Sequence, residues 1–365
     1  MAERGAQPNV PKVRQRLLRA ARAFTTPLMP DDYLEMINPL WSTRELRGRV
    51  ERICRETDDA VTVEIRPGYE WAGHQPGQYV RVGFDIDGVR HWRAYSLTSE
   101  PDRPDGFISI TPKLVESGKV SPYVNRELKP GQLVFLSDVE GQFVLPDPLP
   151  DKLLFISAGS GITPIMSMLR SLHREGEVRD IVHLHSSRRP EGVIFGAELR
   201  AVAGEHASFK LHEQHTGEHG RISPGDLDRL CPDWRERETF ASGPGELLDA
   251  LTEHWERECD PEHLHMERFQ PVIGGDLAEG EGGTIKFLNS DREVDCDGGT
   301  PILVAGEEAG LELPFGCRMG ICHTCVGTFR SGKLRDLRSG EVSDAEGLTC
   351  RTCVNAPEGP VEIEL

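Results

Sequence analysis

The stretch Cys317-Arg-Met-Gly-Ile-Cys322-His-Thr-Cys325 is followed, after 24 intervening residues, by Cys350-Arg-Thr-Cys353. Five of the nine cysteines of the chain lie in these two runs. The N-terminus has no continuous apolar core of the signal-peptide kind. Clustered cysteines in such a chain indicate metal ligation in a reducing compartment rather than a framework of disulfides.

Two kinds of metal site use these cysteines. The C-x4-C-x2-C spacing of the first run is that of a plant-type [2Fe–2S] site. Its glycines, Gly316 and Gly320, let the backbone curl close so that amides face the negative cluster. The two C-x2-C pairs alone would instead suit a zinc ribbon. Because a zinc ribbon has no role for Cys317, the pattern favours [2Fe–2S], with Cys350 and Cys353 both far enough along the chain to be the fourth ligand.

Residues 284–365 resemble a plant-type ferredoxin. The resemblance rests on the cysteine run and on Cys353-Val-Asn-Ala-Pro357, which is followed by apolar Val361 and Ile363. It implies a β-grasp fold that begins with the strand 284–288 and ends with 362–365. It also implies that the ligands are Cys317, Cys322, Cys325 and Cys353.

Upstream of this segment, from residue 152 onward, the sequence has the alternating strand and helix pattern of an α/β domain. A buried-strand run at 153–157 leads into Ala158-Gly159-Ser160-Gly161-Ile162-Thr163-Pro164, a helical stretch at 164–172 and a second strand at 181–185. A strand, a glycine-rich turn and a helix in this order predict a parallel βαβ unit. Amides at such a turn suit phosphate groups.

Residues 46–146 are β-rich, with strands expected at 61–65, 79–82 and 107–110 and Pro-Gly turns between them. Arg93-Ala94-Tyr95-Ser96 resembles the R-x-Y-S motif of the ferredoxin–NADP reductase family. The segments Pro76-Gly77-Gln78-Tyr79-Val80 and Gly118-Lys119-Val120-Ser121 fit the same family in order and spacing. Three matching elements make this a strong joint signal.

The resemblance assigns FAD to this β-rich region. It implies that Arg93 binds phosphate, for which a guanidinium is suited, and that Tyr95 and Ser96 meet the flavin ring. It implies that the backbone around Thr111 and Lys113 meets the ring edge. The remaining implied flavin contacts are Ala94 and the helix-opening residues Gly118, Lys119, Val120 and Ser121.

The same family resemblance assigns the α/β region to a nicotinamide dinucleotide. The G-x-G-x-T-P turn supplies Gly159, Gly161, Thr163 and Pro164 to its phosphates. Hydroxyl and guanidinium groups in Ser187-Arg188-Arg189 suit the 2′-phosphate of NADPH, whereas an acidic residue would suit NADH. Ser242-Gly243-Pro244 stands where many relatives have Cys-Gly-Pro, and Glu267-Arg268-Phe269 matches the family's E-x-F segment near the flavin. Ser96 and Glu267 are the expected catalytic residues.

These signals predict a multidomain α/β and β protein. An antiparallel flavin-binding β-barrel is followed by a nucleotide-binding α/β domain with a parallel sheet and by a C-terminal β-grasp ferredoxin domain. The expected division is a basic helical segment at 1–45, the FAD domain at 46–148, the NADP domain at 149–270, a flexible linker at 271–283 and the ferredoxin domain at 284–365.

The expected activity is transfer of electrons from NADPH through FAD and a [2Fe–2S] cluster to an oxygenase-type acceptor. Thr26-Pro27-Leu28-Met29-Pro30-Asp31-Asp32-Tyr33-Leu34 and Asn38-Pro39-Leu40-Trp41 look like actinobacterial reductases that serve membrane acyl-CoA desaturases. The alternatives are the reductase of a soluble hydroxylase or ring-hydroxylating dioxygenase, some of which use FMN, and a non-enzymatic redox-sensing or zinc-binding adaptor.

Charge and hydropathy bear on partners and location. The net charge of −18 argues against nucleic-acid binding. No apolar run approaches the roughly 20 residues of a membrane helix. Residues 1–24 nevertheless carry six basic residues against one acidic residue. A short amphipathic helix over 17–24 would either pack its apolar stripe on the flavin domain or let residues 12–24 touch an anionic membrane. We expect a cytoplasmic protein, with peripheral contact at the inner face of the cell membrane in the second case.

Overall fold

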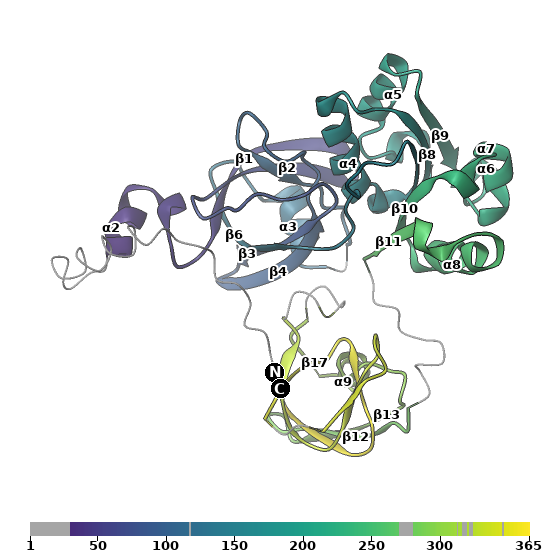
Figure 1. The fold of residues 1–365 in the computed structure, drawn as a ribbon. Helices are drawn as coiled ribbons and strands as arrows, with labels where there is room; N and C mark the ends of the chain where they lie inside the picture. The colour runs from purple at the N-terminus through teal and green to yellow at the C-terminus, as the bar shows by residue number, and fades with distance from the viewer. Residues whose placement is uncertain are drawn as a thin grey trace.

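The computed structural model contains four sheets among the residues it describes (Figure 1). The described residues are 30–116, 118–269, 280–311, 313–315, 320, 324–344 and 347–365. The expected amphipathic helix at 17–24, the cluster residues Cys317 and Cys322, and most of the expected linker lie outside them.

The first sheet is antiparallel and barrel-like, with strand order β4-β3-β6-β1-β2-β5. Its core is built from alternate apolar residues such as Val63, Ile65, Val80 and Val82, all fully buried. This is the predicted flavin-type barrel. Its elements are α2 (Pro30–Ile37), η1 (Pro39–Trp41), β1 (Arg47–Thr57), β2 (Ala60–Pro67), β3 (Tyr79–Ile86), β4 (Val89–Ser96), β5 (Ile108–Ile110), α3 (Val120–Arg126) and β6 (Leu133–Glu140).

The second sheet is parallel, with order β11-β10-β7-β8-β9, as the βαβ prediction required. Helices α4 and α5 pack on one face and α7 and α8 on the other. Its larger elements are β7 (Lys152–Ala158), α4 (Ile162–Glu175), β8 (Asp180–Ser187), α5 (Gly196–Glu205), β9 (Phe209–His215), β10 (Glu238–Gly243), α8 (Gly245–Glu258) and β11 (Leu264–Arg268). Its shorter elements are η2 (Gly159–Gly161), η3 (Pro190–Gly192), α6 (Thr216–His219), η4 (Pro224–Asp226), α7 (Leu227–Leu230), η5 (Trp234–Glu236) and η6 (Pro261–His263).

A buried arginine holds the amino-terminal edge of this sheet together. The Arg237 side chain is only 2% exposed. It donates to both carboxylate oxygens of Asp233, to the carboxylate and main-chain oxygen of Asp180, and to the main-chain oxygen of Leu153, at 2.8 to 3.2 Å. Because these groups lie at the starts of β7, β8 and β10, one cation fixes the alignment of three strands.

Helix α4 joins the parallel-sheet domain to the barrel. Ser167 Oγ donates to the main-chain oxygen of Ser99 at 2.6 Å, and Arg170 Nη1 donates to that of Thr98 at 2.7 Å. Arg174 Nη1 donates to the main-chain oxygen of Asp102 at 2.9 Å. The helix that opens at the glycine-rich turn is therefore anchored along its length to a segment of the barrel domain.

The C-terminal region contains a five-stranded mixed sheet, β13-β12-β19-β14-β17, and a small sheet, β16-β15-β18. The first and last strands, β12 and β19, pair in parallel, as in a β-grasp fold. This region lies below the other two in Figure 1. Its elements are β12 (Gly283–Phe287), β13 (Arg292–Cys296), α9 (Ile302–Glu308), β14 (Val326–Ser331), β15 (Leu334–Asp336), β16 (Val342–Ser343), β17 (Thr349–Arg351), β18 (Asn355–Pro357) and β19 (Val361–Glu364).

Within the described ranges, no helix is both long and apolar enough to span a membrane.

Candidate functional site

One large cleft, of about 1140 Å³, receives residues from all three regions of the chain. The barrel contributes β4 residues and the 111–121 segment, and the parallel-sheet domain contributes Ser160, Thr163 and the strand β11. The C-terminal region contributes Phe315. Of the sequence-predicted residues, the cleft is lined by Arg93, Ala94, Tyr95, Ser96, Thr111, Lys113, Gly118, Val120, Ser121, Thr163 and Glu267.

The end of β4 forms the barrel side of the cleft. Ser96, at the end of β4, is the register partner of Tyr79 on the adjacent strand β3. The side-chain oxygen of Ser96 is buried without a hydrogen-bond partner among the described residues. Burial raises the pKa of the Tyr95 hydroxyl. Tyr79 donates its hydroxyl to Glu140 Oε2 at 3.2 Å. A buried hydroxyl without a hydrogen-bond partner, next to aromatic rings, suits the heteroatom edge of a planar ligand.

The 111–121 segment presents main chain rather than free side chains to the cleft. Thr111 Oγ1 lies 2.9 Å from Thr62 Oγ1, and Lys113 Nζ pairs with Asp59 at 3.3 Å. Ser121 Oγ accepts the amide of Val115 at 3.0 Å. These side chains are therefore engaged within the barrel domain, and the contact of the backbone here with a ligand stays a prediction. Lys119, the N-cap of α3, does not line the cleft.

The glycine-rich turn between β7 and α4 packs directly on the end of β10. A Cβ atom placed on Gly161 would lie 2.1 Å from the main-chain oxygen of Ser242, so only glycine fits. Gly159 has a left-handed φ of 55°. Thr163 Oγ1 donates to the Ser160 carbonyl at 2.9 Å, which shapes the turn. Pro164 lies buried in the first turn of α4. Ser242, Gly243 and Pro244, at the end of β10 against which this turn packs, do not line the cleft.

Ser242 and Glu267 are register partners on the adjacent parallel strands β10 and β11. Ser242 Oγ and Glu267 Oε2 are both buried and have no hydrogen-bond partner among the described residues. Burial raises the pKa of Glu267 to about 8. At neutral pH the carboxyl is therefore mostly protonated and able to donate a hydrogen bond into the cleft.

Beyond the cleft, at the carboxyl end of β8, two arginine side chains are exposed. The guanidinium groups of Arg188 and Arg189 have no ion pair or hydrogen bond with any described residue, unlike Arg237 at the opposite edge. Ser187 is buried and donates to the main-chain oxygen of Arg189 at 2.9 Å, which fixes the loop. Free cations at this edge leave room for an anionic ligand.

The cysteines of the C-terminal region fall into two environments. Cys325 and Cys353 are buried in one small cluster with Leu303 and Val354. The amide of Gly320, which has a left-handed φ of 69°, donates to Cys353 Sγ at 3.2 Å. Cys350 instead packs in the main β-grasp core, where burial raises the pKa of its thiol to about 11.

Three family models match the chain in succession. They are an oxidoreductase FAD-binding domain over residues 50–144, an oxidoreductase NAD-binding domain over 155–240 and a 2Fe-2S iron–sulfur cluster binding domain over 285–355. An NADPH oxidoreductase of Mycobacterium tuberculosis is 44% identical over 96% of this chain and 92% of its own length. The glycine betaine monooxygenase reductase subunit of Pseudomonas aeruginosa is 31% identical over 80% of this chain and 87% of its own.

The chain belongs to the ferredoxin–NADP reductase-like family of flavin oxidoreductases with a C-terminal [2Fe–2S] domain. A solved phthalate dioxygenase reductase covers 88% of this chain and 98% of its own with a TM-score of 0.58, and at 21% identity it shares the fold. This reductase therefore uses NAD(P)H, FAD and a [2Fe–2S] cluster, and the zinc-ribbon and non-enzymatic interpretations of the sequence are set aside.

The residues of the reductase fit these groups. The cleft slightly exceeds the roughly 300–1,000 Å³ of ordinary ligand pockets, as a dinucleotide cofactor requires. Its orphaned Ser96 oxygen and its Arg93 side chain offer a ring contact and a phosphate contact. In the C-terminal domain, thiol sulfur held by a backbone amide suits a negatively charged cluster.

Several cleft residues were not predicted from the sequence as site residues. Most of them contribute apolar or aromatic side chains that carry no motif of their own, although Tyr79 belongs to the quoted P-G-Q-Y-V segment and Phe269 to the quoted E-R-F segment. Phe315 lies only two positions before Cys317, and that proximity was the available signal. These residues are Tyr79, Gln142, Phe143, Met266, Phe269 and Phe315.

Proposed function

We propose that this reductase takes a hydride from NADPH and delivers single electrons, through FAD and the cluster, to a membrane fatty acyl-CoA desaturase. The observation that carries the electron path is the shared cleft. Thr163 of the nucleotide turn, Ser96 of the flavin strand and Phe315 of the cluster domain all line it. The bound cofactors supply the conversion of a two-electron hydride into single electrons.

In this proposal the protein orients the reactants and excludes water. Ser96 Oγ bonds the flavin edge, and the protonated carboxyl of Glu267 donates a hydrogen bond beside it. Ser242, next to Glu267 on β10, closes the site from behind the nicotinamide. The support is that Ser96 Oγ, Glu267 Oε2 and Ser242 Oγ are buried without partners among the described residues. Ser96 and Glu267 line the cleft, and Ser242 lies beside Glu267 on the neighbouring strand.

The proposed cluster ligands are Cys317, Cys322, Cys325 and Cys353. Cys353 is preferred to Cys350 because the amide hydrogen bond to its sulfur comes from Gly320, which lies within the C-x4-C-x2-C run, whereas the thiol of Cys350 is hydrogen-bonded to the backbone of Gly327 on β14. Cys325 and Cys353 lie in the same small group of buried side chains, whereas Cys350 lies in the main core of the domain. Amide donors are what a negative cluster needs around its sulfur atoms.

For the nucleotide, we propose that NADPH is preferred to NADH. Arg188 and Arg189 place two exposed guanidinium groups after a strand that ends in Ser187 and carries no terminal acid. A 2′-phosphate would pair with these cations and gain charge-assisted hydrogen bonds. The M. tuberculosis relative is described as an NADPH oxidoreductase, which agrees with this choice.

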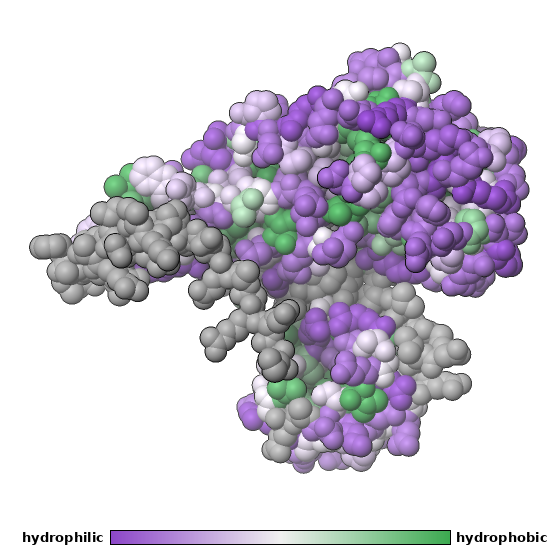
Figure 2. Space-filling view, viewed as in Figure 1, coloured by the Kyte–Doolittle hydropathy of each residue, from purple (hydrophilic) through white to green (hydrophobic). Residues whose placement is uncertain are grey.

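The membrane acceptor is supported by the N-terminal part of the chain. Helix α2 and the following turn expose four large side chains, Tyr33, Met36, Ile37 and Trp41, with Met36 77% exposed. Figure 2 shows hydrophobic side chains at this end of the molecule, on a largely hydrophilic surface. The six basic residues of 1–24 precede this patch in the sequence. Apolar and aromatic groups beside basic ones are the composition of a membrane-surface anchor.

The test is electron delivery to two kinds of acceptor. Purified full-length reductase and a variant lacking residues 1–24 are given NADPH with soluble cytochrome c or with desaturase-containing membranes. We expect equal cytochrome c reduction and, at low salt, reduced desaturation with the truncated protein. Met36→Ser/Ile37→Ser should act like the truncation, whereas the matched exposed change Val89→Ser on the β3–β4 hairpin should not. Equal desaturation by all variants would contradict the membrane contact.

A second acceptor class has its own support. The glycine betaine and 3-ketosteroid relatives are described as reductase components of monooxygenases. If this chain serves a soluble hydroxylase or dioxygenase, product formation will occur with that oxygenase, with no requirement for membranes and with no effect of the α2 substitutions.

A further inference from the structure

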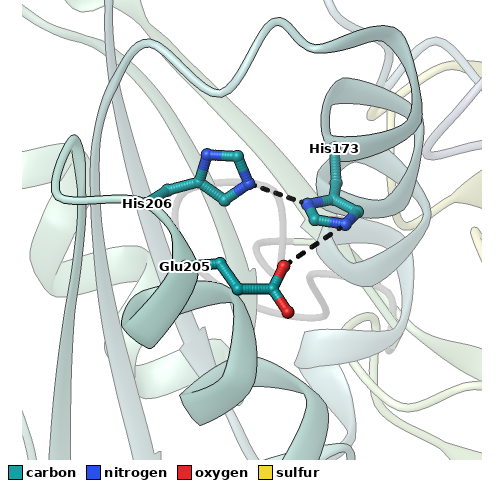
Figure 3. A group of neighbouring side chains, drawn as sticks. All are labelled: His173, Glu205 and His206. Atoms are coloured by element: carbon teal, nitrogen blue, oxygen red, sulfur yellow. Dashed lines mark hydrogen bonds and ion pairs between the residues drawn. The ribbon is translucent and has the colours of Figure 1, made fainter.

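A cluster of metal-binding side chains lies outside the electron-transfer cleft. His173, in the last turn of α4, meets Glu205 and His206 at the end of α5 (Figure 3). One ligand atom from each of the three residues lies within 4.8 Å of the others. None of the three lines the main cleft. We propose that these residues form a zinc site, with water as the fourth ligand.

The two imidazoles are already close to metal-ligand spacing. His173 Nδ1 lies 3.0 Å from His206 Nε2, and the ring planes are nearly perpendicular, at 87°. Two nitrogens bound to tetrahedral zinc at about 2.0–2.1 Å lie roughly 3.3 Å apart. A zinc ion can therefore replace the shared proton with a small outward movement of the two rings. The carboxylate of Glu205, 61% exposed, lies 3.8 Å from His173 Nε2, the other nitrogen of that ring. Binding zinc as the third ligand would therefore require this exposed side chain to rotate, over a distance that the 4.8 Å spacing of the three ligand atoms allows.

The backbone that carries the ligands is firmly held. The amide of His206 donates to the Val202 carbonyl at 2.9 Å, and its carbonyl accepts from Phe209 at 3.0 Å. Leu172, next to His173, and Val202 are buried in the same core. Because the scaffold is preorganised, binding would order only three side chains, which lowers the entropy cost of forming the site.

Nearby arginines do not oppose a cation here. Arg170 pairs with Glu198 at 2.6 Å and donates to Thr98, and Arg174 is turned to the Asp102 carbonyl of the barrel domain. Two imidazoles and one carboxylate are a ligand set that zinc uses with an open position for water. The bound ion would tie the end of α4 to the end of α5 within the nucleotide-binding domain.

The experiment is calorimetric titration of Zn²⁺ into the full-length protein, which keeps its iron–sulfur cluster and has been freed of other divalent metal ions. We expect one zinc equivalent per chain to be lost, or weakened by more than about tenfold, in His173→Ala and in His206→Ala. Glu205→Gln should weaken the same equivalent. His219→Ala is the matched control, because His219 is an exposed histidine next to a single glutamate, Glu218, with no second imidazole in contact among the described residues.

A second readout separates this site from the cysteines and from the reductase activity. Zinc should raise the unfolding temperature of the wild-type protein and of His219→Ala, but not that of His173→Ala or His206→Ala. NADPH-dependent cytochrome c reduction without zinc should be unchanged in all of them. Zinc binding that is identical in wild-type, His173→Ala and His206→Ala protein would overturn the proposal, whatever the fate of the proposed electron acceptor.

Discussion

The two ends of the parallel sheet differ in whether their buried polar groups have hydrogen-bond partners. At the amino-terminal edge, Arg237 makes hydrogen bonds to three residues, and the side-chain hydrogen bond from Arg237 holds the pKa of Asp233 well below its usual range. At the carboxyl-terminal edge, Ser242 is fully buried and Glu267 is half-buried, and the buried atoms Ser242 Oγ and Glu267 Oε2 have no partners among the described residues. Since burying an unsatisfied polar group costs stability, the second edge is built for something that binds there, and the first is built to hold the strands together.

A second contrast, between two neighbouring cysteines that lie in different buried cores, gives the largest expected effect. Cys353→Ser should abolish cluster assembly, because the serine oxygen is a poor substitute for a thiolate ligand. Cys350→Ser should leave the cluster in place and cost only core packing. The iron content and the visible iron–sulfur absorption of anaerobically purified protein distinguish them. The reverse result would make Cys350 the fourth ligand.

The satisfied edge is tested by removing its cation. Arg237→Ala should lower the free energy of unfolding by roughly 3 kcal/mol, because several hydrogen bonds to charged and main-chain groups are lost, while Asp180 and Asp233, 45% and 34% exposed, can still be solvated. Ser242→Ala should change it by less than about 1 kcal/mol, since no hydrogen bond with a described residue is lost. Denaturant unfolding of the flavin-loaded proteins measures both. Equal losses would erase the distinction between the two edges.

The unsatisfied edge has a pH signature. The pKa of Glu267 is raised in the folded protein to about 8 from an ordinary value of 4.5. Folding therefore favours the protonated form, and the stability linked to this group is present at low pH and is lost as pH rises through that interval. Glu267→Gln should remove this loss, so the variant gains stability relative to wild type between pH 5 and 8. Chemical unfolding of cofactor-free protein across this range is the measurement, and parallel stability curves would contradict the assigned shift.

The smallest predicted effect concerns the exposed cations. Arg188→Ala/Arg189→Ala should lower kcat/KM for NADPH by about one to two decades and leave that for NADH nearly unchanged, since hydrogen bonds to charged groups contribute roughly 1.5–3 kcal/mol. Arg179→Ala, at the opposite edge of the sheet, is the matched control because its side chain already pairs with Glu177. Unchanged nucleotide preference in the double variant would remove these arginines from the site.

Elements that carry a local pattern are predictable from the sequence. Strands at 61–65, 79–82, 153–157 and 181–185 are expected from apolar alternation or buried runs, and each forms within a longer strand. The strand expected at 107–110 is shorter in the structure, where β5 spans Ile108–Ile110. The R-x-Y-S segment lines the cleft, and the G-x-G-x-T-P turn contributes Ser160 and Thr163 to it. Both segments were recognisable from the sequence because each needs particular residues in a fixed order.

Contacts that depend on tertiary placement were not predictable in this way. Arg237 has no motif, and its role exists only because Asp180, 57 residues away, arrives at the same edge of the sheet. Phe315 reaches the cleft through the arrangement of whole domains. The His173–His206 pair brings together residues 33 positions apart on separate helices. In each case the partner is set by the path of the chain, which local periodicity does not encode.

The docking of α4 on the barrel domain has a consequence for how such reductases diverge and recombine. All three acceptors, at Thr98, Ser99 and Asp102, are main-chain oxygens, whereas all three donors are side chains of α4. The hydrogen-bonded part of this joint therefore depends on the path of the barrel loop and not on the side chains of that loop. Its apolar part does depend on side chains, because Ala60 and Phe143 share a buried core with α4 and a Cβ atom on Gly77 would lie 2.5 Å from Met168. A nucleotide-binding module that carries the three α4 donors would keep its orientation on a foreign barrel only if that barrel kept both the loop length and these apolar contacts.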